Sequence, residues 1–239
     1  MKRALVTGGS GGIGSAICRR LAADGYFVII HANTNLARAQ ALAEAIRVDG
    51  GQAEAIAFNI TDAEACRVAL ETLVADTPIQ VLVNNAGIHD DAVFPGMSAA
   101  QWHSVLDVSL NGFFNVTQPL SLPMLRSRWG RIINITSIAG ITGNRGQTNY
   151  AAAKGALHAV TKTLSLEMAS RGVTVNAVAP GIIQTDMIDG VFDEKMIAGM
   201  VPMKRAGRPQ EVANLVSFLA SEQASYISGQ IISVNGGMI

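Results

Sequence analysis

Short, unbroken apolar runs recur along the chain, and longer stretches with apolar residues three or four positions apart separate them. Runs of the first kind are typical of strands buried on both faces, and stretches of the second kind are typical of helices that cover a sheet. The predicted strands are residues 4–6, 27–30, 55–58, 81–83, 131–135, 173–178 and 230–234. The alternation therefore predicts an α/β protein with a doubly wound parallel sheet and helices on both faces.

The helices expected between these strands carry recognisable start and stop signals. Three of them are expected at residues 15–23, 36–48 and 209–219. A fourth is capped by Thr61 and Asp62 and ends near residue 74, and a fifth, longer one is capped by Ser98. The sixth carries Tyr150 and ends near residue 170. Pro119 and Pro123 are expected to kink or break the stretch that Ser98 caps, because proline lacks the N–H that a helix interior needs. No linker divides the pattern, so we expect a single domain over residues 1–239.

Composition narrows the class of protein. Apolar residues make up 49% of the 239 residues and charged residues 15%, which suits a buried core rather than disorder. The formal net charge is zero, which argues against nucleic acid or an anionic membrane as the main partner. Cys18 and Cys66 form no disulfide or metal-binding pattern, and no apolar run approaches the roughly 18 residues of a membrane span. We therefore expect a cytoplasmic protein with no metal site, no nucleic-acid partner and no membrane contact.

A glycine-rich turn lies between the first predicted strand and the first helix. Gly8, Gly12 and Gly14 follow Thr7 with the spacing Gly-x-x-x-Gly-x-Gly. Glycines let the backbone approach a pyrophosphate closely, and the helix start offers free N–H groups and the positive end of the helix dipole. A tight, packed turn without a ligand is the alternative, but the place of this turn directly after the first strand favours nucleotide binding.

A tyrosine and a lysine, Tyr150 and Lys154, lie four residues apart in an alanine-rich stretch. Alanine favours helix, so both side chains are expected on one helix face. A neighbouring ammonium lowers the pKa of a phenol, which is ordinarily about 10, and lets it exchange a proton near neutral pH. Ser137, just after the fifth predicted strand, is placed to add a hydroxyl hydrogen bond to the same reacting oxygen. The alternative is an ordinary helix with a packed tyrosine and a solvated lysine.

The order and spacing of several motifs resemble the short-chain dehydrogenase/reductase family over essentially the whole chain. These motifs are Thr7-Gly8-x-x-x-Gly12-x-Gly14, Asn84-Asn85-Ala86-Gly87, Asn111, Ser137, Tyr150-x-x-x-Lys154 and Pro180-Gly181. Within the family, residues 146–154, 170–176 and 228–238 resemble the β-ketoacyl-acyl carrier protein reductases. The resemblance implies a Rossmann fold and an oxidoreductase that uses a nicotinamide cofactor.

The roles known in the family fall on four residues as catalytic candidates. Tyr150 would protonate the substrate carbonyl, Lys154 would hold the nicotinamide ribose and lower the pKa of the phenol, and Ser137 would hydrogen-bond the carbonyl. Asn111 would anchor a water in the proton relay; the alternative is an amide that bonds close by within its own helix. The cofactor contacts that the resemblance implies are Gly8, Ser10, Gly11, Gly12, Ile13, Gly14, Asn33, Thr34, Asn59, Ile60, Asn85, Ala86, Gly87, Tyr150, Lys154, Pro180, Gly181, Ile183 and Thr185.

The residues after the second predicted strand bear on the choice of cofactor. NAD-using relatives carry a carboxylate there for the ribose 2′-hydroxyl, but this chain has Ala32 at that place. With no acidic side chain to repel a 2′-phosphate, NADP (as NADPH) is the favoured cofactor. NADP-using relatives often have an arginine in the glycine loop, where this chain has Gly11. The contacts would come instead from His31, Asn33, Thr34 or Arg38.

The resemblance also implies partners. Arg128 and Arg171 occupy places that, in the carrier-protein reductases, lie near the cleft and meet the acidic acyl carrier protein; the alternative is a surface charge at Arg128 and a helix-dipole contact at Arg171. Residues 182–208 resemble the family's flexible substrate lid. The small side chains between Ala151 and Ala159 resemble a subunit interface of a homo-oligomer, usually a tetramer, or else pack tightly within one subunit.

The function that these observations favour is NADPH-dependent reduction of a 3-oxoacyl thioester on acyl carrier protein, in fatty-acid or related polyketide or polyene synthesis. An alcohol, sugar or steroid dehydrogenase of the same family is one alternative. A non-catalytic dinucleotide-binding sensor is another, although a sensor has no need of the combined Asn111, Ser137, Tyr150 and Lys154 set.

Overall fold

The computed structural model describes residues 1–185 and 193–239, and within them seven parallel strands form one sheet. The strands are β1 (Arg3–Val6), β2 (Phe27–Ala32), β3 (Gln52–Ala57), β4 (Val81–Asn84), β5 (Gly130–Ile135), β6 (Val173–Pro180) and β7 (Ile231–Val234). Their order across the sheet is β3-β2-β1-β4-β5-β6-β7, so the strand order reverses between β1 and β4. In open α/β sheets such a switch point creates a crevice at the carboxyl ends of the strands.

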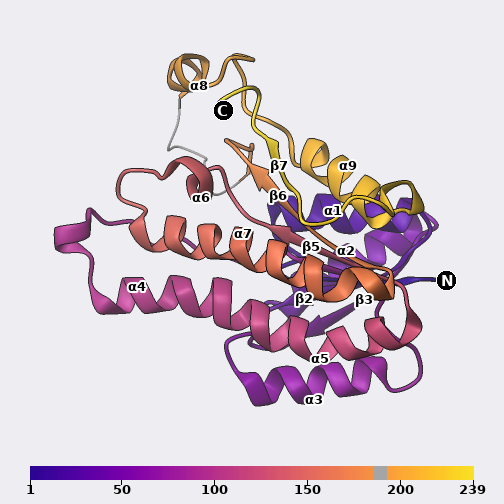
Figure 1. Cartoon of the computed structure of the whole chain (residues 1–239). Helices are drawn as coiled ribbons and strands as arrows, with labels where there is room; N and C mark the ends of the chain where they lie inside the picture. Colours follow the sequence, from indigo (N-terminus) through magenta and orange to yellow (C-terminus); the bar gives the residue numbers. More distant parts are fainter. Residues whose placement is uncertain (186–192) are drawn as a thin grey trace.

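Helices cover both faces of the sheet, which confirms the predicted doubly wound α/β fold (Figure 1). One face carries α1 (Gly12–Ala23), α2 (Leu36–Val48) and α9 (Pro209–Ala220). The other face carries α3 (Ala63–Val74), α5 (Gly112–Ser127) and α7 (Thr148–Met168). Shorter helices complete the structure: α4 (Ala99–Leu106), α6 (Ala139–Thr142) and α8 (Glu194–Met200). None of the helices in the described part of the chain is long and apolar enough to cross a membrane.

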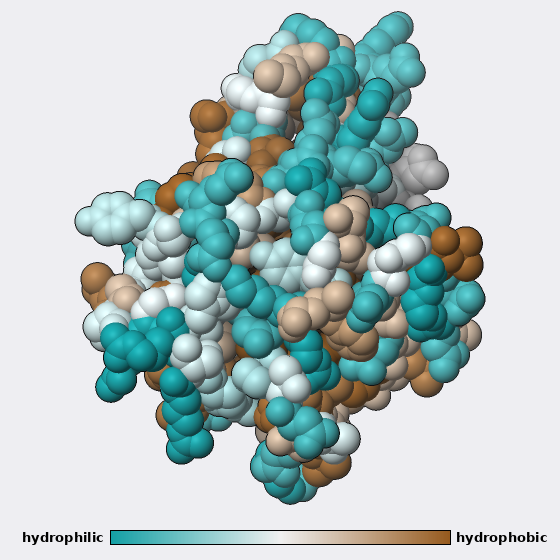
Figure 2. All heavy atoms as spheres, turned by 90° about the vertical axis from the view of Figure 1, so that its right-hand side faces the viewer, coloured by the Kyte–Doolittle hydropathy of each residue, from teal (hydrophilic) through white to brown (hydrophobic). Residues whose placement is uncertain are grey.

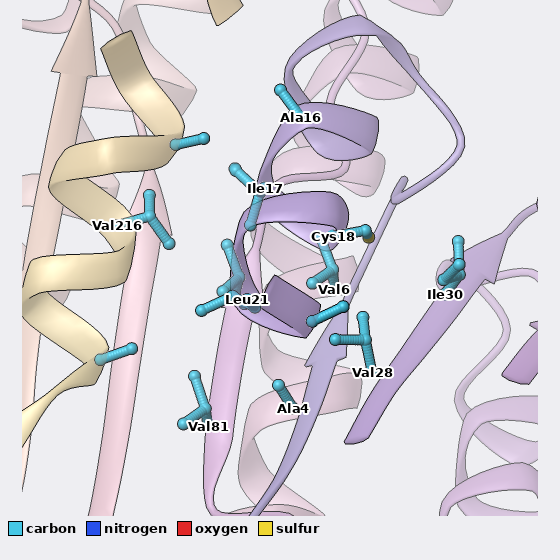
Figure 3. Packing of buried hydrophobic residues seen from close by; sticks show 14 of the residues in the cluster. Ala4, Val6, Ala16, Ile17, Cys18, Leu21, Val28, Ile30, Val81 and Val216 are labelled. Atoms are coloured by element: carbon cyan, nitrogen blue, oxygen red, sulfur yellow. The ribbon is translucent and has the colours of Figure 1, made fainter. Parts of the chain in front are cut away.

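Each face of the sheet has its own hydrophobic core. In the core beneath α1 and α9, the side chains of Val6, Leu21 and Val216 have an exposed fraction of 0%, and Figure 3 shows them meeting between the strands and the two helices. Fully burying a leucine or valine side chain stabilises a fold by about 1.5–3 kcal/mol relative to leaving it exposed. Truncating Leu21 to alanine would cost about 2–5 kcal/mol, because a cavity forms as well.

Side-chain caps begin two of the helices where the sequence predicts them. The Asp62 carboxylate accepts a hydrogen bond of 3.0 Å from the backbone N–H of Ala65, at the start of α3. Ser98 and Gln101 form a reciprocal capping box at the start of α4. Each cap satisfies N–H groups that the first helical turn leaves without partners, and a cap typically contributes about 1 kcal/mol.

The predicted break near Pro119 and Pro123 is wrong, because α5 continues through both prolines to Ser127. A proline in a helix interior costs about 3 kcal/mol. Leu120 and Met124 on the same helix are at most 1% exposed, and their burial offsets that cost. The α-helical pattern is interrupted earlier instead, where Asp107–Asn111 form a π-helical turn between α4 and α5. Turns of this kind are frequent at functional sites.

The segment expected to form a substrate lid, residues 182–208, is described in part. Ile183 and Gly207 pair as an isolated parallel bridge, which ties together the two ends of the segment. Helix α8 lies between those ends. Residues 186–192 of the expected lid lie outside the described residues.

Candidate active site

A cavity of about 470 Å³ lies at the carboxyl ends of the strands around the switch point. It is lined by Gly8, Ser10, Gly11, Gly12, Ile13, Gly14, Ala32, Asn33, Arg38, Asn85, Ala86, Gly87, Ile135, Thr136, Ser137, Tyr150, Lys154, Pro180, Gly181, Ile183 and Thr185. The glycine-rich loop after β1 and the tyrosine–lysine pair of α7 are distant in sequence, yet they share this cavity. Most of the residues expected to contact a cofactor are therefore brought together.

The glycine-rich loop needs its glycines for space. Gly8 has a φ of +60°, in the left-handed region that favours glycine. A Cβ atom on Gly14 would overlap the carbonyl oxygen of Gly8, and a Cβ atom on Gly12 would lie 2.8 Å from Cγ2 of Thr185. The loop thus folds closely on itself and places Thr185 against the start of α1, where unpaired N–H groups favour an anion.

Two side chains fix the loop to the neighbouring strand. The hydroxyl oxygen of Thr7 accepts hydrogen bonds from the N–H groups of Asn85 and Ala86 at 3.0 and 3.1 Å. The side-chain amide of Asn85 donates in return to the carbonyl oxygens of Thr7 and Gly8 at 2.9 and 3.0 Å. These bonds join the ends of β1 and β4, so Asn85 shapes the cavity as well as lining it.

His31 lies beneath the glycine-rich loop rather than on the cavity wall, so its expected contact with a 2′-phosphate is wrong. Its exposed fraction is 1%, its Nδ1 accepts a 3.2 Å hydrogen bond from the N–H of Gly8, and its Nε2 lies 2.8 Å from the carbonyl oxygen of Phe58. Burial lowers the pKa of His31 to about 4, so the ring is neutral near pH 7 and offers a phosphate no positive charge. Asn33 and Arg38 do line the cavity.

Lys154 is enclosed at the centre of the site. Its exposed fraction is 3%, and its Nζ donates a 3.0 Å hydrogen bond to the carbonyl oxygen of Ile135. The same Nζ lies 5.5 Å from the centroid of the Tyr150 ring. A Cβ atom on Gly87 would lie 3.0 Å from this Nζ, so the end of β4 approaches the lysine only because residue 87 is small. Burial lowers the pKa of Lys154 to about 8, and the ammonium form still predominates at pH 7.

Tyr150, in the first turn of α7, hydrogen-bonds with Ser137. Burial raises the pKa of Tyr150, the bond with Ser137 lowers it, and the negative charge of Asp91 raises it; the net direction is upward. The expected lowering of this pKa by Lys154 is not found, because Lys154 is not among the groups that shift it and desolvation of the phenolate sets the direction. Tyr150 consequently keeps its proton at neutral pH.

Four of the residues expected to act in catalysis or to contact the cofactor lie outside the cavity as the described residues define it. The side-chain amide of Asn111 donates to the Asp107 carboxylate at 2.7 Å within the π-helical turn. Asn59 accepts hydrogen bonds within its own turn, and Ile60 is buried in the core with an exposed fraction of 5%. Thr34 is exposed on the surface. None of these four residues is part of the cavity wall that the described residues form.

Two residues of the cavity wall were not expected from motifs. Ile135 and Thr136 end β5 and its extension, directly before Ser137. The carbonyl oxygen of Ile135 accepts from Lys154, and the hydroxyl of Thr136 donates to the carbonyl oxygen of Val178 at 3.1 Å. The rule that ligands bind at the carboxyl ends of parallel strands is the signal that identifies such residues.

Arg128 and Arg171 lie at the opposite edge of the sheet from the cavity. Arg128 directly follows α5 and Arg171 lies just before β6, so both adjoin the amino ends of strands. The eight residues of β6 put roughly 25 Å between the two edges. Figure 2 looks onto the side of the molecule that contains the amino ends, where most side chains are hydrophilic and hydrophobic groups are scattered. Neither arginine is therefore near the cavity of its own chain.

Comparisons with known proteins identify the family of this chain. A family model described as short chain dehydrogenase matches residues 2–196. Nodulation protein G of Azospirillum brasilense is 45% identical over 247 residues, which cover 99% of this chain and 98% of that protein. The 3-oxoacyl-acyl-carrier-protein reductase FabG of Staphylococcus aureus is 44% identical over 240 residues, with 99% and 98% coverage. The corresponding reductase of Aggregatibacter actinomycetemcomitans is 42% identical, with 98% coverage of both chains.

Proposed function

The chain belongs to the short-chain dehydrogenase family, and from that premise we propose that it is an NADP-dependent oxidoreductase that reduces a 3-oxoacyl thioester, carried on acyl carrier protein, to the 3-hydroxyacyl form. Two full-length relatives named as 3-oxoacyl-acyl-carrier-protein reductases support this substrate class. The reaction belongs to fatty-acid synthesis or to a related polyketide or polyene pathway.

The observation that carries the proposal is the meeting of Tyr150, Ser137 and Lys154 with the glycine-rich loop in one cavity. The site suits NADPH because the start of α1 offers N–H groups to a pyrophosphate and because the glycines of the loop after β1 line the cavity, where they allow a close approach to the backbone. Ala32 presents no carboxylate to a 2′-phosphate, and Arg38 supplies a cation on the same wall. Bound NADPH supplies the hydride that reaches the carbonyl carbon.

The three side chains handle the proton and the developing charge. Tyr150 is protonated at neutral pH and donates its proton to the carbonyl oxygen, while the hydroxyl of Ser137 hydrogen-bonds that oxygen and the phenol. The phenolate left on Tyr150 is stabilised by the ammonium of Lys154, 5.5 Å from the ring centroid. Asn111, at the end of the π-helical turn, is the proposed anchor of a water that returns the proton.

The proposal includes a cytoplasmic homo-oligomer, most simply a tetramer. Exposed apolar side chains on α5 and α7 support a helix-to-helix contact between subunits: Phe114, Leu122 and Leu166 are 61%, 51% and 84% exposed. An oligomer also gives Arg128 and Arg171 a role, since they are remote from the cavity of their own chain. In an oligomer they contact an acidic carrier that serves the cavity of a neighbouring subunit.

Substrate panels test this function. NADPH and NADH oxidation is followed with acetoacetyl groups on acyl carrier protein and on a free thioester, and with alcohol, sugar and steroid ketones. The proposal expects NADPH oxidation with both thioesters, and a KM raised only for the carrier-linked one when Arg128 and Arg171 become alanine. Turnover confined to alcohols, sugars or steroids would favour the related dehydrogenases. NADPH binding without turnover of any carbonyl would favour a sensor.

A further inference from the structure

The loop that follows β4 is fastened to the segment that leads into Tyr150. The backbone N–H of Ala92 donates to the carbonyl oxygen of Gly146 at 2.9 Å, and Ala92 pairs with Gln147 as an isolated parallel bridge. Gln147 is the N-cap residue of α7, three positions before Tyr150. The backbone of this loop is therefore in register with the start of the helix that carries the phenol.

Asp91 in this loop fixes the side chain of Gln147. Its Oδ2 accepts a 2.8 Å hydrogen bond from Nε2 of Gln147, and Oε1 of Gln147 accepts a 2.9 Å bond from the amide of Asn144. Both ends of the Gln147 amide are thus held, which fixes its orientation. The other carboxylate oxygen of Asp91 lies 3.4 Å from Nδ1 of His89.

Asp90, the preceding residue, contributes through its backbone. Its carbonyl oxygen accepts a 2.9 Å bond from the side-chain amide of Asn149, which is 0% exposed, and Oδ1 of Asn149 accepts from the N–H of Tyr150 at 2.8 Å. The carboxylate of Asp90 is directed elsewhere, accepting a 2.8 Å bond from Gln101. The two neighbouring acids therefore differ in these contacts. The carboxylate of Asp91 binds Gln147, in the segment that leads into Tyr150, whereas the carboxylate of Asp90 binds Gln101.

The charge of Asp91 also reaches the phenol. Besides burial, the negative charge of Asp91 raises the pKa of Tyr150, and the bond with Ser137 opposes both. Among the described residues, the charged and titratable groups that lie over Tyr150 or shift its pKa are the ammonium of Lys154 on α7 and the carboxylate of Asp91 in the loop after β4, and His89 contacts that carboxylate. A carboxylate near a phenol disfavours the phenolate and so favours the form that donates a proton.

We propose that Asp91 is a positioning residue of the reductase site: its carboxylate fixes the side-chain amide of Gln147 and thereby holds the start of α7, the helix that carries Tyr150. The inference rests on the proposed carbonyl reduction for its kinetic consequence. Its electrostatic part concerns the phenol itself and is measurable without any substrate.

Matched variants separate the two parts. Asp91→Asn keeps an acceptor for Nε2 of Gln147 and removes the charge, and Asp91→Ala removes both. Asp90→Asn makes the same change of charge one residue away and serves as the control. Phenolate formation is recorded by ultraviolet difference titration, with Tyr150→Phe providing the contribution of the other two tyrosines, Tyr26 and Tyr226.

We expect Tyr150 to titrate at lower pH in Asp91→Asn and the alkaline limb of kcat to move in step, with the KM for acetoacetyl thioester nearly unchanged. Asp91→Ala is expected to show the same shift and a KM raised roughly 3- to 10-fold, as for a lost hydrogen bond. Asp90→Asn is expected to change neither. An unshifted titration in Asp91→Asn, or an equal shift in Asp90→Asn, overturns the inference. If the wild type does not reduce the thioester, the proposed function is contradicted. The titration of Tyr150 in the Asp91 variants still decides the role of Asp91 in that case.

Discussion

Nδ1 of His31 accepts a hydrogen bond from the backbone N–H of Gly8 at 3.2 Å, so the end of β2 supports the loop that follows β1. Because that N–H is only a donor, Nδ1 carries no proton and Nε2 carries it toward the carbonyl oxygen of Phe58. If Nδ1 were protonated, its N–H would face the N–H of Gly8, and neither group could accept a hydrogen bond from the other. The neutral ring is therefore part of the architecture of the glycine-rich loop.

Acid should destabilise the protein through His31. Its pKa is about 4 in the fold against the ordinary 6.5, so between those pH values the unfolded chain binds a proton that the folded chain does not. Stability then falls as the pH drops from about 6.5 to 4, by up to about 3 kcal/mol. Urea unfolding at a series of pH values measures this. His31→Asn keeps an acceptor for Gly8 but does not titrate, and a slope as steep as that of the wild type would refute the assignment.

Gly12→Ala should weaken NADPH binding, because its Cβ would meet Cγ2 of Thr185 at 2.8 Å. Thr185→Ser removes that methyl group and keeps the hydroxyl, so the double variant should regain part of the lost affinity. Fluorescence titration with NADPH gives the four dissociation constants of the cycle. Strictly additive losses of NADPH binding free energy in the double variant would mean that residues 12 and 185 are not in contact.

Arg38→Ala should raise the KM for NADPH by about 10- to 100-fold and leave that for NADH nearly unchanged. Arg38 lines the cavity beyond Ala32, and a charge-assisted bond to a phosphate is worth about 1.5–3 kcal/mol. Arg67→Ala, on the exposed face of α3, is the control. An equal rise in KM for NADPH and NADH would show that Arg38 does not bind the 2′-phosphate.

Lys154→Met should stabilise the fold at pH 7 while it abolishes activity. The pKa of Lys154 is about 8 in the fold against the ordinary 10.5, so at pH 7 folding buries an ammonium at a cost of up to about 3 kcal/mol. Between pH 8 and 10.5 only the unfolded chain binds this proton, so the wild type gains stability there and the gap to the variant narrows. Urea unfolding at pH 7 and 9.5 tests the sign of the stability difference between Lys154→Met and the wild type. Lys162→Met, at an exposed lysine, serves for comparison.

Local sequence signals predict most of the elements of this fold. Helix α2 is expected at residues 36–48 and found at Leu36–Val48, because its cap and its glycine stop are both local. Strand β6 runs two residues beyond its expected end, to Pro180, because pairing with β7 sustains it and pairing is non-local. Helix α5 survives its prolines for the same kind of reason, since core burial outweighs a local cost.

The part of the site that consists of sequence motifs can be predicted from the sequence. The glycine-rich loop, Ser137, Tyr150 and Lys154 carry recognisable spacing, and the structure brings them into one cavity. His31 gives no such signal, because its burial depends on β3 and on Phe58. The direction of the Tyr150 pKa also escapes sequence reasoning, since it is set by desolvation and by Asp91, neither of which spacing reveals.

The central claim is that Tyr150 delivers the proton to the substrate carbonyl. The most direct measurement is the rate of NADPH oxidation with an acetoacetyl thioester by the wild type and by Tyr150→Phe, together with the NADPH affinity of each. We predict that kcat falls by about 100-fold or more, since a positioned general acid contributes about that much or more, while the affinity for NADPH changes little. A Tyr150→Phe variant that turns over at the wild-type rate would contradict the account.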